Sequence, residues 1–178
     1  RLTELQDNCI IEHLGVSVQN PEELTTALNL DTVSHIQMPF NIIDWRWSKF
    51  EKKIIEVKRR RKITIHVRSV FLQGLLLSSD KALWKKAKVK ESRKIIDWLH
   101  KMVQNTSCTE IADLCLQYIR SKSWIDGLVV GMETEEQAIK NIKFFNNTPI
   151  SLDLMTDIES TRPLVSVETL NPSKWINQ

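Results

Sequence analysis

The sequence is poor in glycine and proline and has no long apolar run. Its 178 residues include four glycines and five prolines, too few for a collagen-like chain or a Pro/Gly-rich disordered one. No apolar stretch approaches the roughly 20 residues needed to cross a bilayer, and no charged segment followed by an apolar stretch opens the chain. We therefore expect a soluble globular protein with no membrane partner.

Cysteine and net charge are also low. Cys9, Cys108 and Cys115 are odd in number and form no C-x-x-C pair, which disfavours a disulfide framework or a zinc site and favours a reduced, cytoplasmic location. The net charge is only +3, and residues 58–62 form one basic cluster that is typical of a solvated helix end. Binding of nucleic acid through this cluster is a weaker hypothesis, and we expect no nucleic-acid partner.

Four short segments rich in β-branched residues predict strands that are too apolar for a solvent-exposed face: 10–18, 34–40, 62–70 and 125–130. Helices are expected between them. Their predicted starts are Asn20 with Pro21 and Glu23, Ser48 with Glu51, Ser107 with Glu110, and Thr134 with Gln137. Another helix is expected over residues 92–103.

Strands that alternate with helices predict an α/β fold with parallel pairing, either a doubly wound sheet or a TIM barrel. Four βα units make half of an eight-unit barrel, whose open edges require a missing partner half. We expect a partial barrel over residues 1–148 and a largely extended C-terminal tail with a short helix over 149–178. The chain starts with Arg1, and residues 1–6 resemble the end of a helix, so we expect a fragment.

The passage VVGMETEEQAIKNI, residues 129–142, predicts a strand end followed by a helix start. Backbone N–H groups at such a junction favour anionic ligands, and Gly131 permits close approach of a ligand to the backbone. Gln137 and Asn141 are four residues apart and therefore share one helix face, where their amides could contact a ring system such as adenine. Two amides at this spacing are more often ordinary surface residues.

Four segments in order resemble the C-terminal half of the aldo/keto reductases, which are NAD(P)H-dependent TIM-barrel oxidoreductases: GVSVQNPEEL, HIQMPFNIIDWRW, ITIHVRSVFLQGLLL and WIDGLVVGMETEEQAIKNI. The ending NPSKW also resembles a bacterial branch of that family associated with polysaccharide or sugar biosynthesis. The resemblance implies a fragment of an oxidoreductase that reduces aldehydes or ketones by hydride transfer.

The resemblance also implies residue roles at the nicotinamide end of the cofactor. Ser17 and Gln37 match the residues that bind the carboxamide, whereas Val18 replaces the usual Asn. Arg68 stands where an aromatic residue often stacks on the nicotinamide ring, and a planar guanidinium could stack there. Ser69 matches a loop that contacts the pyrophosphate.

At the adenosine end, the matching residues are Gly131, Glu133, Thr134, Gln137 and Asn141. Thr134 replaces the basic residue that often neutralises the 2′-phosphate of NADP, and Glu133 beside it would repel a phosphate. The resemblance therefore leaves the cofactor open as NADP(H) or NAD(H).

The family's catalytic Tyr, Lys, Asp and His lie upstream of the matched region, so no catalytic residue is expected in this chain. Its one tyrosine, Tyr118, is predicted to be a core residue of a helix. The four histidines lack metal-ligand spacing, and we expect no metal site. The expected partners are a small-molecule carbonyl substrate and the missing N-terminal half-barrel. The alternative function is a non-catalytic, reductase-like binding or regulatory module.

Overall fold

The computed structural model describes residues 1–175, and the chain divides into two compact units. The first unit contains the sheet and the helices packed on it. The second contains most of the remaining helices. The ranges of the first unit are Arg1–Phe40, Arg46–Arg68 and Ser123–Val129, and the rest of the chain belongs to the second.

The first unit contains a four-stranded parallel sheet with the order β1-β2-β3-β4. The strands are β1 (Leu14–Ser17), β2 (Val33–Pro39), β3 (Thr64–Arg68) and β4 (Gly127–Leu128). This confirms the predicted four parallel strands. β1 and β4 are shorter than predicted, since each lies at an edge of this sheet and pairs with one neighbour only.

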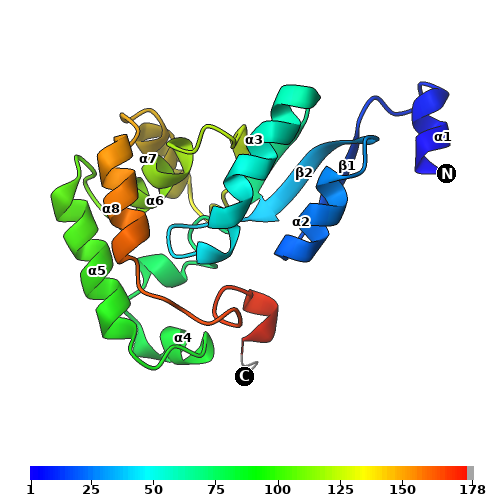
Figure 1. Cartoon of the computed structure of the whole chain (residues 1–178). Helices are drawn as coiled ribbons and strands as arrows, with labels where there is room; N and C mark the ends of the chain where they lie inside the picture. Colours follow the sequence, from blue (N-terminus) through cyan, green and yellow to red (C-terminus); the bar gives the residue numbers. More distant parts are fainter. Residues whose placement is uncertain (176–178) are drawn as a thin grey trace. The chain divides into compact units, whose positions relative to one another are not determined.

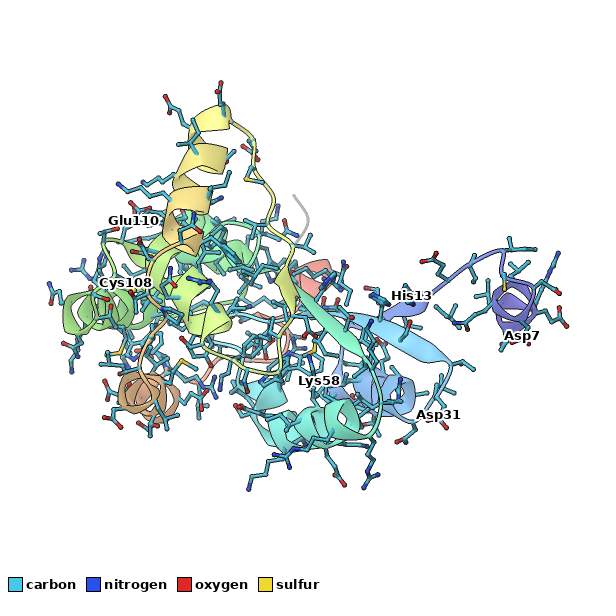
Figure 2. The ribbon with its side chains drawn as sticks, turned by 90° about the horizontal axis from the view of Figure 1, so that it is seen from above. Asp7, His13, Asp31, Lys58, Cys108 and Glu110 are labelled. Atoms are coloured by element: carbon cyan, nitrogen blue, oxygen red, sulfur yellow. The ribbon has the colours of Figure 1, made fainter. Side chains whose placement is uncertain are left out.

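Helices cover one face of this sheet. Figure 2 shows α2 (Pro21–Leu28) and α3 (Glu51–Arg60) on the same side of the strands. Ile36, Met38, Ile65 and Val67 alternate along the two central strands and are at most 1% exposed, so they form the core of this unit. α1 (Leu2–Asp7) lies apart from this core and has no buried residue (Figure 1).

The predicted start of α2 is confirmed, because the Asn20 side chain accepts a hydrogen bond from the Glu23 amide. The predicted start at Ser48 is wrong. The chain instead enters a 3₁₀ helix, η1 (Trp45–Phe50), and α3 follows directly from it. Trp47 is 1% exposed, so burial of this aromatic residue accounts for the earlier start.

The other face of the sheet is open and polar, which contradicts the expectation of strands buried on both faces. Gly15, Ser17 and His66 are exposed, and His35 and Gln37 are partly exposed. The alternating residues of β2 and β3 are apolar on the helix side only. The side chains on this face are therefore available for contacts with groups outside the described chain.

The second unit is helical. It consists of α4 (Lys81–Lys86), α5 (Ser92–Asn105), α6 (Ile111–Arg120), α7 (Glu135–Phe145), α8 (Leu152–Thr161) and the 3₁₀ helices η2 (Leu75–Leu77) and η3 (Pro172–Lys174). α6 is its central element, with every residue from 112 to 119 buried. Within the described residues no helix is long and apolar enough to cross a membrane.

Two predictions for this unit need correction. α6 does not begin at Ser107, since its N-cap is Glu110 and the Thr109 amide donates to Asp113 inside the helix. The segment from residue 149 is also more helical than expected. Ser151 caps α8, and the apolar residues Met155 and Ile158 bury one side of this helix.

Candidate functional site

Ser17 and Gln37 lie side by side on the open face of the sheet. They are partners in the register of β1 and β2, and Gln37 is in turn the partner of His66 on β3. These three side chains form one layer across the sheet. They border a hollow of about 290 Å³ that is also lined by Gly15, Val16, His35 and Ile36. The structure therefore brings together the two residues predicted to bind a carboxamide.

Two glycines make room for the histidines on this face. A methyl group at Gly15 would come within 3.1 Å of His35 Cβ, and one at Gly127 would come within 2.8 Å of His66 Cδ2. Gly127 therefore leaves room for the His66 ring, and Gly15 leaves room for the Cβ and backbone of His35. The small and polar side chains keep the hollow open.

The histidines form a row across the sheet. The ring centroids of His13 and His35 are 4.8 Å apart, and those of His35 and His66 are 6.4 Å apart. Figure 2 shows His13 on the side of the strands opposite Lys58 of α3. Burial and the neighbouring His13, His66 and Lys62 lower the pKa of His35, whereas Asp126 opposes this shift. The row therefore favours neutral His35 near pH 7.

Arg68 lies at the carboxyl end of β3. Its Nη2 atom donates to Gln19 Oε1 at 2.8 Å and to the Val18 carbonyl at 3.4 Å, both just beyond β1. Its register partner on the intervening strand β2 is Pro39. The guanidinium therefore spans the carboxyl ends of three strands, one layer beyond Ser17 and Gln37.

The loop after β3 contains a cluster of left-handed residues. Ser69, Leu72 and Gln73 have φ values of 62°, 48° and 55°, and Gly74 follows with 77°. Non-glycine residues rarely adopt this conformation, and such strain concentrates at functional sites. The Ser69 carbonyl accepts from Asn41 Nδ2 at 3.5 Å and from the Leu72 amide at 2.9 Å. The strained residues therefore lie in the loop that was predicted to contact the pyrophosphate.

The other predicted site residues lie at the start of α7. Thr134 is its N-cap and accepts from the Gln137 amide at 3.2 Å, as predicted. The Gln137 side chain is partly committed to the backbone, because its Oε1 accepts from the Glu133 amide at 2.9 Å. Gly131 is exposed and a methyl group there would meet nothing within 4 Å, so packing within the chain does not require glycine. Asn141 is partly exposed.

Comparison with known protein families matches residues 1–162 to the aldo/keto reductase family. The chain belongs to this family. No curated protein sequence matches the chain.

Several solved structures share the fold of this chain. An aldo-keto reductase from Bacillus halodurans matches in its holo form with a TM-score of 0.70 and 19% identity, over 92% of this chain and 54% of that one. Its apo form matches with a TM-score of 0.72 and 19% identity, over 92% and 55%. Glycerol dehydrogenase from Gluconobacter oxydans matches with a TM-score of 0.63 and 16% identity, over 89% and 51%.

The reductase chain thus spans about half the length of the solved structures that it matches. Its four parallel strands and flanking helices correspond to a partial barrel, as predicted. Ser17, Gln37 and Arg68 belong to the first unit, whereas Ser69 and the α7 residues belong to the second.

A buried polar network in the reductase chain was missed from the sequence. Asp113 is 0% exposed and accepts hydrogen bonds from Thr109, Gln117 and Asn147. Gln117 Nε2 also donates to the Phe144 carbonyl at the end of α7. The network therefore anchors the carboxyl end of α7 to α6. The signal was available, because Asp113 and Gln117 are a polar i, i+4 pair within an otherwise apolar helix.

The amino-terminal turns of α7 are anchored much less firmly than its carboxyl end. They project from the other helices of this unit in Figure 2, and residues 133–137 are all exposed. One ion pair reaches this helix further along, between Lys140 and Glu110 at 2.6 Å. The exposed helix start remains accessible to a ligand.

Tyr118 is a core residue, as predicted. Its side chain is 0% exposed, and its hydroxyl donates to Glu159 Oε1 at 3.1 Å. Burial raises the pKa of Tyr118, so this phenol is not suited to donating a proton to a substrate. Among the described residues no group of three or more His, Cys, Asp or Glu side chains is placed to hold a metal ion.

The basic cluster 58–62 makes structural contacts within its own unit. Lys58 pairs with Asp126 and Arg60 with Glu56. Arg61 donates to the backbone carbonyls of Val33 and Leu28. These contacts account for much of the cluster without a nucleic-acid partner.

Proposed function

We propose that this chain supplies the cofactor-binding half of a nicotinamide-dependent aldo/keto reductase that reduces aldehydes or ketones. The observation that carries the proposal is the in-register pair of Ser17 and Gln37 beside a hollow, in a chain that belongs to this family. The bound nicotinamide would supply the hydride. Residues of this chain hold and orient its ring.

The side chains present fit that role. A serine hydroxyl and a glutamine amide both donate and accept hydrogen bonds, as the two ends of a carboxamide require. Arg68 offers a flat group beyond this pair, where the resemblance implies stacking. In the second unit, Ser69 begins a strained loop, and α7 presents its N-terminus with Gln137 and Asn141. These features support pyrophosphate and adenosine binding respectively.

The proton donor must come from outside this chain. Since Tyr118 is buried in α6, we assign the acid to the missing N-terminal half-barrel, which would also bring the family's Lys, Asp and His. The substrate is a small carbonyl compound, and the sugar-biosynthesis resemblance favours a sugar derivative. Residues 149–178 remain our candidate for a tail over the barrel mouth, although 176–178 lie outside the described residues. Three free cysteines, two of them buried, agree with a reduced cytoplasmic location.

Titration of NADH and NADPH against the complete reductase tests this proposal. Gln37→Ala should weaken binding about fivefold, the effect of losing one hydrogen bond of about 1 kcal/mol. Gln104→Ala is the matched control, because Gln104 is exposed on α5. Equal cofactor affinities in wild type and Gln37→Ala would refute the role of Gln37. Failure of the complete protein to bind either dinucleotide would refute the proposal as a whole.

A second candidate is a non-catalytic, reductase-like binding or regulatory module. The features that support it are the cofactor-binding residues named above, because binding a dinucleotide through them does not by itself require catalysis. Saturable cofactor binding without turnover of any aldehyde or ketone by the complete protein would support this alternative. Turnover would exclude it.

A further inference from the structure

Beyond the hollow, at the carboxyl end of β3, lies a guanidinium that has no carboxylate partner among the described residues. Arg68 Nη2 donates to two neutral oxygens, Gln19 Oε1 and the Val18 carbonyl. Within residues 1–175 no Asp or Glu oxygen lies within ion-pair distance of Arg68. Its Nε and Nη1 atoms make no hydrogen bond to any described residue.

Three other arginines have a carboxylate nearby, whereas Arg120, like Arg68, donates to neutral oxygens only. Arg60 pairs with Glu56, Arg61 approaches Asp31, and Arg93 pairs with Asp97. The Arg60 and Arg93 pairs lie at the surface, where water alone would satisfy a guanidinium. Arg68 is only partly exposed, yet it has neutral partners alone. Its orientation is therefore fixed while its charge remains uncompensated.

A second guanidinium contacts the same glutamine. Arg46 Nη1 donates to the Gln19 carbonyl at 3.5 Å, so one glutamine contacts two arginines through its two oxygens. Arg46 is 5% exposed. Gln19 therefore contacts both side chains at the carboxyl ends of the strands.

The register places this charge one layer beyond the residues that line the hollow. Arg68 is two residues beyond His66 on β3, and His66 aligns with Gln37 and, through it, with Ser17. An anionic group on the guanidinium would thus lie one layer beyond the proposed carboxamide site. Arginine binds carboxylate and phosphate through the edge of its planar group, which leaves its face available for stacking.

We propose that Arg68, held by Gln19, binds an anionic group of the substrate. The substrate class is then a carbonyl compound that carries a carboxylate or a phosphate, in preference to a neutral aldehyde or ketone. This inference rests on the proposed function, since it assigns the substrate of the same site. A stacking role of Arg68 on the nicotinamide ring is compatible with it.

Direct binding to the complete reductase tests the anion site without turnover. Benzoate and inorganic phosphate are titrated by calorimetry, with benzamide as the neutral match for benzoate. We expect at least one of the two anions to bind the wild type and benzamide not to bind. Arg68→Gln should weaken anion binding by about tenfold or more, as for a lost charged hydrogen bond. Circular dichroism verifies that the variant is folded, and Arg68→Lys serves as a charge-retaining second variant.

Arg93→Gln is the control, because Arg93 lies on α5 with Asp97 and should not affect anion binding. Equal anion affinities in wild type, Arg68→Gln and Arg68→Lys would overturn the inference. So would equal binding of benzamide and benzoate, or binding of neither anion. A response to phosphate alone would assign the substrate group as phosphate, and a response to benzoate alone would assign it as carboxylate.

Turnover by the complete reductase separates this inference from the proposed function. 4-Carboxybenzaldehyde is compared with its neutral methyl ester, and glyceraldehyde 3-phosphate with glyceraldehyde. We expect kcat/KM to favour at least one anionic member by about tenfold and Arg68→Gln to remove that preference. Turnover without any such preference would overturn the inference and leave the proposed function standing. An equal loss for charged and neutral substrates, with weakened cofactor binding, would make Arg68 a cofactor contact only.

Discussion

Asp113 is the residue on which the placement of α7 depends most directly. Its carboxylate accepts from the Thr109 amide at 2.9 Å, from Gln117 Nε2 at 3.1 Å and from Asn147 Nδ2 at 3.1 Å. The side chain is 0% exposed, so water cannot replace these contacts. All three partners donate N–H groups. Asn147 follows α7 directly, and Gln117 also donates to the Phe144 carbonyl at the end of α7.

Asp113→Asn keeps the shape of the side chain but replaces one acceptor oxygen with a donor. The new NH₂ group must face at least one N–H group of Thr109, Gln117 or Asn147. A hydrogen bond to a charged acceptor contributes about 1.5–3 kcal/mol, and an unpaired buried donor costs a similar amount. With two bonds weakened or lost, we expect the free energy of unfolding to fall by about 3 kcal/mol or more.

Urea unfolding of wild type and Asp113→Asn measures this change. Asp97→Asn is the matched control, because Asp97 forms an exposed i, i+4 pair with Arg93 that contributes only about 0.3–0.5 kcal/mol. Amide hydrogen exchange should also show faster opening of α7 in Asp113→Asn. If the two variants unfold alike and α7 exchanges as in wild type, the network does not anchor this helix.

Three further predictions concern charge and the core. The pKa of His35 is lowered in the folded state, so the folded state binds fewer protons than the unfolded state. The melting temperature should therefore decrease as the pH is lowered through about 6.5, and it should decrease less in His35→Gln. Parallel pH profiles of the two proteins would contradict this. Glu133→Lys should improve the affinity for NADPH relative to NADH by about fivefold or more in fluorescence titrations, because it replaces repulsion of the 2′-phosphate with attraction. An unchanged ratio of the two affinities would show that Glu133 does not lie near the 2′-phosphate. Tyr118→Phe should reduce the free energy of unfolding by about 1 kcal/mol through loss of the bond to Glu159, and cofactor binding that weakens along with it would contradict a purely structural role.

The N-cap patterns in the sequence predicted the helix starts only where contacts between neighbouring residues determine the start. Asn20 and Thr134 each cap a helix through a residue three positions on, and both predictions were confirmed. Ser48 and Ser107 have the same spacing, yet neither begins an α-helix. At the first, the buried Trp47 is part of an earlier 3₁₀ turn. At the second, the Thr109 amide donates to Asp113, a carboxylate that also receives a long-range bond from Asn147.

The candidate site was partly predictable for the same reason. Ser17 and Gln37 were found by their resemblance to family motifs, and the strand register then placed them next to each other. The contact of Arg68 with Gln19 could not be predicted, because these residues are 49 positions apart and meet across an intervening strand.

The sequence by itself determined the parallel α/β architecture, since β-branched segments alternating with capped helices leave few other ways to bury their apolar residues. It also determined the family, through motifs that each lie within a few neighbouring residues. Only the tertiary structure decided which face of the sheet is polar and open, that Arg68 lacks a carboxylate partner among the described residues, and that α7 is anchored at one end. These properties depend on contacts between side chains from distant segments, and the spacing of residues along the sequence does not predict such long-range contacts.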